Sequence, residues 1–162
     1  MSGSTVTFVP DSGDGVQIGT NTAGLFSLSL PAGSSGHLHA LREYDPATDG
    51  TITASDALDV LRLAVGLAPS WGNATPLDFI AADINQDGEV TAADALEVLR
   101  AAVGLQSVHR PRWVFFDTDI DLSGVNRGHT DIEMGVRIDA LTAGLADVSM
   151  TGVLLGNMQE YA

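Results

Sequence analysis

The chain contains no cysteine, so disulfides and zinc–thiolate sites are excluded. Basic residues are scarce: 21 acidic residues stand against 7 basic ones, which gives a formal net charge of −14. Phosphate binding requires clustered lysine and arginine, so we expect no nucleic-acid partner. No apolar run is long enough to span a bilayer, and we therefore expect no membrane insertion.

Motifs typical of catalysis are also missing. The sequence has no G-x-S-x-G nucleophile elbow and no phosphate-cradling glycine loop. Because there is no cysteine nucleophile either, we expect that the chain is not an enzyme.

An oxygen-rich loop, DINQDGEVTAAD, runs from Asp83 to Asp94. Oxygen-bearing side chains stand at its first, third, fifth and twelfth places, and the glycine at the sixth place permits a sharp turn. Calcium takes roughly six to eight oxygen ligands in flexible geometry, so this pattern predicts a Ca²⁺ site. The predicted ligands are Asp83, Asn85, Asp87, the backbone carbonyl of Glu89, and Asp94.

A degraded copy of this loop, DPATDGTITASD, lies upstream. Ala47 stands at the third place, where water can complete the calcium shell. We therefore expect two calcium ions, the first loop binding more weakly than the second. The predicted ligands of the first loop are Asp45, Asp49, the backbone carbonyl of Thr51, and Asp56.

Two further groups of polar residues are weaker candidates. The segment DTDIDLSG allows a weaker third calcium ion near Asp117, Asp119 and Asp121, but it lacks the glycine and the closing carboxylate, and a solvated strand end is the alternative. His37 and His39 alternate along an expected strand. No further ligand stands at a recognisable spacing, so we interpret them as surface or packing residues.

The order of patterns along the chain is β, helical, then β. Alternation with a period of two predicts strands in both flanks: Thr5–Val9, Leu25–Leu30, His37–Arg42, Trp113–Phe116, Met134–Ile138 and Val148–Leu155. In the middle, each loop runs into a helix that begins at a threonine N-cap, Thr53 or Thr91. The apolar residues of each helix share one face: Ala57, Leu58, Leu61, Ala64 and Val65, and their equivalents Ala95, Leu96, Leu99, Ala102 and Val103.

These elements predict an α+β protein in which one β-sandwich is built from both flanks and an all-α pair of loop–helix units is inserted between them. The expected segments are a β flank at 1–43, the calcium-binding module at 44–106 and a second β flank at 107–162. Two separate small β elements are the alternative.

The duplicated loop–helix unit, which closes on aspartate and omits one entering helix, resembles a type I dockerin from about Asp45 to Leu105. Dockerins are calcium-dependent modules of secreted bacterial proteins that bind cohesin domains. The resemblance implies that a cohesin-like partner contacts loop places ten and eleven and the following helix. Here those residues are Ala54, Ser55, Leu61, Arg62, Ala92, Ala93, Leu99 and Arg100.

The sequence thus favours two functions. In the first, calcium orders a module that attaches to a cohesin-like or other surface protein domain. In the second, calcium rigidifies a structural domain of an adhesin or surface protein that has no cohesin partner. Millimolar extracellular calcium keeps such loops filled, so we expect an extracellular or cell-surface location. The N-terminal MSGSTVTF lacks the features of a secretory signal, and we interpret the chain as a fragment of a larger secreted protein.

Overall fold

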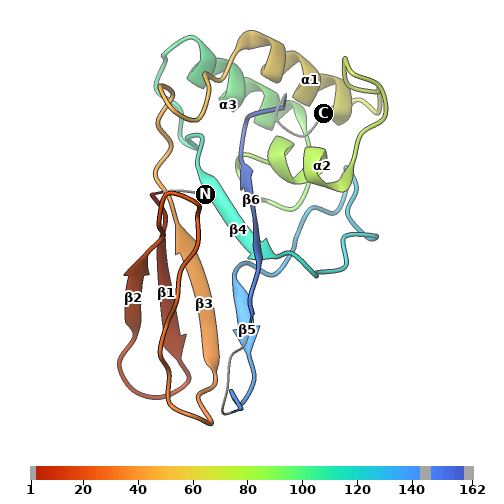
Figure 1. Ribbon diagram of the computed structural model, residues 1–162. Coiled ribbons are helices and arrows are strands. Elements are labelled where there is room, and N and C mark those ends of the chain that lie inside the picture. The colour runs from red at the N-terminus through yellow and green to blue at the C-terminus, as the bar shows by residue number, and fades with distance from the viewer. Residues whose placement is uncertain (1–2, 143–146, 159–162) are drawn as a thin grey trace. The chain divides into compact units, whose positions relative to one another are not determined.

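The computed structural model describes residues 3–142 and 147–158 (Figure 1). Contacts divide the chain into two compact units. Unit 1 comprises Met1–Glu43, Val114–Ile120 and Glu133–Gly152; unit 2 comprises Tyr44–Trp113, Asp121–Ile132 and Val153–Ala162. The described residues form both helices and antiparallel sheets, which confirms the predicted α+β class. The three expected domain segments remain a prediction.

Within the described residues, unit 1 contains a four-stranded antiparallel sheet with the order β2-β1-β3-β5 (Figure 1). The strands are β1 (Thr5–Pro10), β2 (Val16–Gly19), β3 (Gly36–Leu41) and β5 (Val136–Ile138). The register places Phe8 opposite Leu38 and Leu38 opposite Val136. These side chains are buried on one face of the sheet and form its core with Val6.

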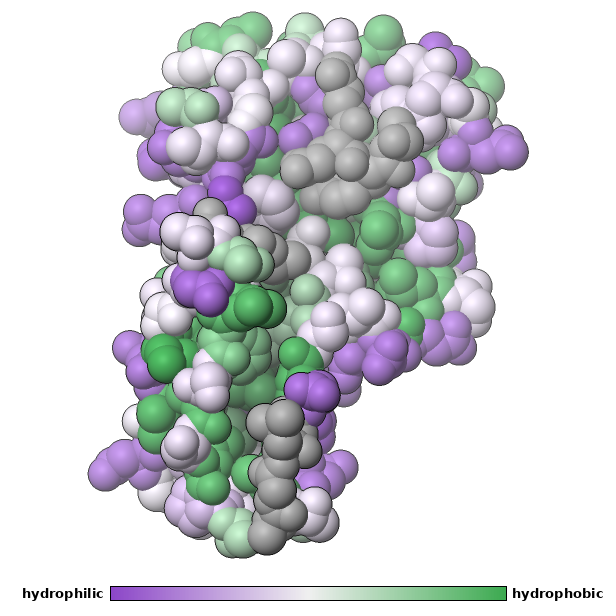
Figure 2. Space-filling model, viewed as in Figure 1, coloured by the Kyte–Doolittle hydropathy of each residue, from purple (hydrophilic) through white to green (hydrophobic). Residues whose placement is uncertain are grey.

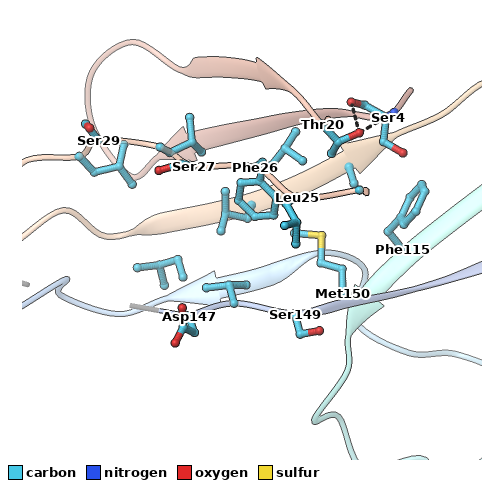
Figure 3. Close-up of a pocket in the computed structure, with 18 of the residues that line it drawn as sticks. Ser4, Thr20, Leu25, Phe26, Ser27, Ser29, Phe115, Asp147, Ser149 and Met150 are labelled. Carbon is cyan, nitrogen blue, oxygen red and sulfur yellow. Dashed lines mark hydrogen bonds between the residues drawn. The ribbon is translucent and has the colours of Figure 1, made fainter. Parts of the chain in front are cut away.

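The expected strand Leu25–Leu30 is not a strand in the structure. Exposure does alternate along it, with Phe26 and Leu28 packed against the core of unit 1. The segment borders a hollow of about 720 Å³, into which Phe26 and Met150 project from opposite sides (Figure 3). Figure 2 shows apolar surface gathered over the strands of this unit. The alternation therefore reflects packing on an apolar face, without a hydrogen-bonded neighbour strand.

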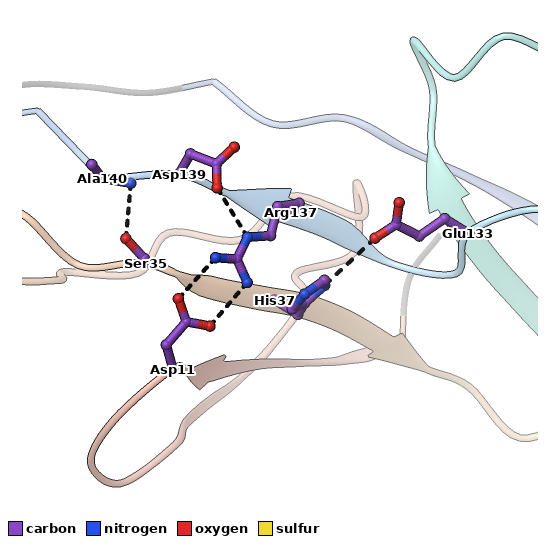
Figure 4. Close-up of polar contacts among 7 residues, drawn as sticks. All are labelled: Asp11, Ser35, His37, Glu133, Arg137, Asp139 and Ala140. Carbon is purple, nitrogen blue, oxygen red and sulfur yellow. Dashed lines mark hydrogen bonds and ion pairs between the residues drawn. The ribbon is translucent and has the colours of Figure 1, made fainter.

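An arginine at the edge of this sheet ties it to the turn after β1 (Figure 4). Both terminal nitrogens of Arg137 donate to the Asp11 carboxylate, at 2.9 and 2.8 Å, and its Nε donates to Asp139 at 3.0 Å. This hydrogen bonding lowers the pKa of Asp11 and raises that of Arg137. The side chains are partly exposed, so the cluster mainly fixes geometry.

Unit 2 contains the helices of the described residues: α1 (Ala54–Ala64), α2 (Pro76–Ala82) and α3 (Ala92–Ala102). The predicted N-caps are confirmed, because Thr53 and Thr91 each form a capping box with the aspartate three residues later. Gly66 and Gly104 have positive φ just past the ends of α1 and α3, the position where a helix termination favours glycine.

Helices α1 and α3 pack against each other. The buried apolar side chains include Ala57, Val60 and Leu63 of α1, with Ala95 and Val98 of α3. The predicted face is largely at the surface, and exposure of its larger side chains is closely matched between the helices: Leu58 56%, Leu61 40% and Val65 60%, against Leu96 48%, Leu99 40% and Val103 57%. Apolar periodicity thus places these side chains on one face of each helix, and the folded chain leaves the larger ones at the surface.

Strands β4 (Trp113–Asp117) and β6 (Met150–Leu154) form a further antiparallel pair among the described residues. Hydrogen bonds continue beyond both ends, from the Thr118 N–H to Ser149 and from the Leu155 N–H to Arg112. In the described part of the chain, no helix combines the length and apolar character needed to cross a membrane.

Candidate calcium-binding loops

The second loop begins at the end of α2 and closes in the first turn of α3. Its first predicted ligand, Asp83, is only 4% exposed. The two carboxylate oxygens of Asp83 accept hydrogen bonds from the backbone N–H groups of Asp87, at 3.2 Å, and Gly88, at 3.1 Å. The loop backbone therefore curls around this carboxylate.

The remaining predicted side-chain ligands of the second loop are joined by hydrogen bonds. The Asn85 side-chain oxygen accepts from the Asp87 N–H at 2.8 Å, and its side-chain nitrogen donates to the Asp87 carboxylate at 2.8 Å. The Asn85 N–H donates to Asp94 at 3.3 Å, while Asp87 accepts from the Glu89 N–H at 3.1 Å. These hydrogen bonds link Asn85 to Asp87 and to Asp94, while the assignment of these residues as calcium ligands remains a prediction.

Asp94, which closes the loop, is fully buried. Burial raises the pKa of its carboxyl group, and the charge of nearby Asp83 acts in the same direction. One Asp94 oxygen caps α3 by accepting from the N–H and hydroxyl of Thr91. Burial beside Asp83 thus disfavours ionisation of Asp94, and a divalent cation held by the loop would offset this effect.

A segment far along the chain lies against this loop. We name residues 125–131 the strap. The Val90 N–H donates to the Arg127 carbonyl at 2.8 Å, and the Thr130 N–H donates to the Gly88 carbonyl at 3.0 Å. The Thr130 hydroxyl also donates to the Asp83 carboxylate. The strap therefore holds both the backbone of the loop and its first ligand.

The first loop has a different arrangement. Asp45 is exposed, and its carboxylate accepts from the Ala47 N–H at 2.9 Å. Asp49 accepts from the Asp45 N–H and from the Trp113 indole, both at 3.0 Å. The closing Asp56 caps α1 with one oxygen, and its other oxygen accepts from the Met158 N–H at 2.8 Å. Partners outside the loop thus occupy carboxylates that the prediction assigns to calcium.

The backbones of the two loops also find different partners. Ile52 and Val90 stand at equivalent places and are both buried. The Ile52 N–H donates to the Tyr44 hydroxyl at 3.3 Å, and that hydroxyl donates to the Gly50 carbonyl at 3.0 Å. The Val90 N–H is bound to the strap instead. Thr51, the predicted carbonyl ligand, is exposed.

The donor chemistry fits calcium better in the second loop than in the first. Among residues 3–142 and 147–158, no three His, Asp or Glu side chains form a ready-made metal cluster. A calcium loop of this type relies on amide, backbone and water oxygens as well as carboxylates. Asp83, Asn85, Asp87, the Glu89 carbonyl and Asp94 are the residues that would hold the ion, which supplies charge neutralisation and links the loop to the start of α3.

Helix α2 begins like the helices that follow the loops. The sequence GNATPLD from Gly72 to Asp78 repeats the pattern of GEVTAAD and GTITASD, and Gly72 has a φ of +118°. Thr75 and Asp78 form the same capping box. In the described structure one buried oxygen of Asp78 has no hydrogen-bond partner. No calcium-loop pattern precedes α2. The capping box therefore forms at a helix start that has no predicted calcium ligands.

Two acidic residues that the sequence reasoning missed fix the segments leaving the helices. Asp59 accepts hydrogen bonds from the N–H and the hydroxyl of Ser70, at 2.7 and 2.9 Å. Glu97, its equivalent in α3, accepts from the Ser107 hydroxyl and from the Val108 and His109 N–H groups. These bonds, the Ser107 one foremost, lower the pKa of Glu97. The sequence did contain a signal for this role, because both repeats have an acidic residue at this equivalent position.

The weaker candidate sites show local hydrogen bonding. Asp117 accepts from the Asp119 N–H and Asp121 from the Ser123 N–H, both at 2.9 Å, a pattern typical of Asx turns. The Ser123 bond lowers the pKa of Asp121. The rings of His37 and His39 stack with centroids 5.9 Å apart, and His37 lies 4.0 Å from Glu133.

The predicted partner-binding residues lie on or near the surface. Ala54, Ser55, Ala92 and Ala93 are exposed at the first turns of α1 and α3. The arginines make contacts within their own repeats. Arg62 donates to the Ala68 carbonyl at 2.7 Å, and Arg100 donates to Glu97 at 2.8 Å. Both arginine side chains therefore form hydrogen bonds near the C-terminal ends of their own helices.

These features define a paired loop–helix module with all-oxygen donor sets. Residues 43–101 match the family described as Dockerin type I domain, which confirms the predicted resemblance for this segment. Dockerin domains are non-catalytic, calcium-binding modules of protein–protein attachment. No curated protein and no solved structure matched the chain.

Proposed function

We propose that the chain is a non-catalytic, calcium-dependent attachment module of a secreted or cell-surface bacterial protein. The observation that best supports this is the combination of an ordered second loop with a matched apolar surface on the helices that the loops introduce. Leu61 and Leu99, at equivalent positions, are each 40% exposed. Large apolar side chains repeated on a surface are typical of a protein-binding site.

We further propose that two calcium ions bind. The ligands are Asp83, Asn85, Asp87, Glu89 and Asp94 in the second loop, and, with lower affinity, Asp45, Asp49, Thr51 and Asp56 in the first. Millimolar calcium outside cells suits loops of this kind. A third ion near Asp117, Asp119 and Asp121 is the weakest part of the proposal, since this segment lacks the glycine and the closing carboxylate of the other loops.

The test measures calcium-dependent capture of the chain by a cohesin-like domain, before and after substitution of the exposed leucines. Leu61→Glu combined with Leu99→Glu should abolish capture without loss of helix content, because charge replaces the exposed apolar contacts. Leu25→Glu, at a side chain 66% exposed in unit 1, is the matched control and should leave capture unchanged. Capture that persists in chelator, or in the double variant, would contradict the proposal.

The second candidate is a calcium-rigidified structural domain whose flanks form one β-sandwich. Ala92 and Ala93 favour it, because dockerins often carry Ser-Thr-like pairs at these recognition positions. In that case chelation lowers the unfolding temperature of the chain, while no cohesin-like domain binds in either condition. Measuring unfolding and capture on the same samples separates the two functions.

A further inference from the structure

The strap provides contacts to the second calcium loop from outside the segment that matches the dockerin family. Residues 125–131 follow that segment in sequence but belong to the same compact unit. The strap is itself a tight turn, in which Asn126 and His129 exchange backbone hydrogen bonds at 2.9 and 3.0 Å. The Asn126 side chain adds a bond from the Gly128 N–H at 2.9 Å. A turn braced in this way presents its outer groups at fixed positions.

The strap forms hydrogen bonds with residues 88–90, which are places six to eight of the second loop. The bonds from Val90 to Arg127 and from Thr130 to Gly88 run in opposite directions between the loop and the strap. Arg127 also donates to the Ala64 carbonyl at 2.9 Å, which ties the strap to the end of α1. The strap thus bridges the second loop and the first helix.

Gly88 allows the close approach on which this depends. Its φ is +92°, and a Cβ atom at this position would lie 2.9 Å from an Asp131 carboxylate oxygen. At Gly50, the equivalent residue of the first loop, a Cβ would meet nothing within 4 Å. The strap therefore distinguishes the second loop from the first.

The strap contacts a predicted calcium ligand directly through Thr130. This residue is 5% exposed, and its hydroxyl donates a hydrogen bond to Asp83. This Asp83 oxygen also accepts the Gly88 N–H, so two donors hold the carboxylate in place. Hydrogen bonds to a ligating carboxylate fix its orientation, and their loss weakens metal binding. We propose that Thr130 is a positioning residue of the second calcium site and that the strap completes this site.

The proposal rests on calcium binding by the second loop and predicts a linkage. Binding of calcium stabilises the bound position of Asp83 and therefore the Thr130 contact. By reciprocity, loosening of the strap lowers calcium affinity.

The test is calorimetric titration of the calcium-free full chain with Ca²⁺ for Thr130→Val, Thr130→Ser and the parent. Thr130→Val keeps the shape and removes the hydroxyl, and should weaken the tighter binding event roughly tenfold or more. Thr130→Ser restores the hydroxyl and should restore affinity. Thr22→Val, at an exposed threonine of unit 1, is the control.

A second variant keeps the test valid if Thr130→Val does not fold. Arg127→Gln, at an exposed side chain, removes only the tie to α1 and should weaken the same event by roughly threefold. Hydrogen exchange adds a readout: calcium should slow exchange of the Val90 and Thr130 amides in the parent, and less so in Arg127→Gln. Parent-like affinity in both variants overturns the inference alone, whereas a parent chain that binds no calcium overturns the proposed function and this inference together.

Discussion

The two loops share a sequence pattern but differ in what surrounds them. In the second loop Asp83 is buried, and the strap holds the Gly88–Val90 backbone. In the first loop Asp45 is exposed, and the closing Asp56 is bound to the distant Met158 amide. One loop has its ligand residues tied to each other, while the other has several of them tied to different parts of unit 2.

From this difference we infer that ligand identity alone does not set the strength of the proposed calcium loops. Ordering a flexible segment costs conformational entropy, on the order of 1–2 kcal/mol per residue. In the second loop, hydrogen bonds within the loop and to the strap would lower this cost. In the first loop, calcium has to compete with Trp113 and Met158 for Asp49 and Asp56. We therefore expect the second loop to fill first.

The largest expected effect comes from removing one ligand in each loop. Asp87→Ala should eliminate the tighter calcium event, lowering its affinity at least about a hundredfold, because a charged ligand is lost. Asp49→Ala should leave that event in place and remove only the weaker one. Titration calorimetry measures both, with Asp14→Ala, an exposed turn aspartate, as the control for lost charge. If Asp87→Ala spares the tighter event, the ranking of the loops is wrong.

The glycines at the sixth loop place give the next largest effect. Gly50→Ala and Gly88→Ala each force a side chain into positive φ, which costs about 1–2 kcal/mol of unfolding free energy. Gly88→Ala must also displace the Asp131 carboxylate, so its loss should be the greater of the two. Urea denaturation in chelator measures both. Adding Asp131→Ala to Gly88→Ala should reduce the loss of unfolding free energy to that of Gly50→Ala. Equal losses in the two single variants would show that Asp131 does not pack closely against Gly88.

The smallest expected effect is a pH-dependent loss of stability when Glu97 no longer holds the segment that follows α3. Because the pKa of Glu97 in the folded chain lies below its ordinary value of 4.5, its stabilisation is present above that value and is lost as pH falls through the folded pKa. Glu97→Gln should therefore cost about 1–2 kcal/mol at pH 7, with the difference from the parent shrinking below pH 4.5. Denaturation from pH 3 to 7 checks this, against Glu43→Gln as an exposed control. A difference that stays constant over this range would contradict the assignment.

Local signals predicted much of the fold and the candidate site. Calcium-type loops, capped helices and the dockerin resemblance follow from residues close together in sequence, such as the Thr91–Asp94 pair. Strand periodicity found β1 and β3, but it also predicted Leu25–Leu30, because packing on an apolar face gives the same alternation as a paired strand. Short β2 lacked a strong pattern and was missed.

Long-range contacts could not be predicted. Nothing local to Thr130 indicates that it reaches Asp83, and nothing near Met158 indicates that its amide reaches Asp56. Leu58 and Val60 are both strongly apolar, and only tertiary contacts determine that Val60 is buried while Leu58 is exposed. Sequence thus identifies the donors of the candidate site, and the folded chain determines which donors are held in place.

The indole of Trp113 hydrogen-bonds to Asp49 and so gives the weaker loop a built-in optical reporter. If Asp49 binds calcium as proposed, the surroundings of the indole nitrogen would change, and with them the emission of this fluorophore. Replacing Trp71, the other tryptophan, by phenylalanine leaves a single emitter. Occupancy of the first loop can then be followed by light alone, without any label attached to the protein.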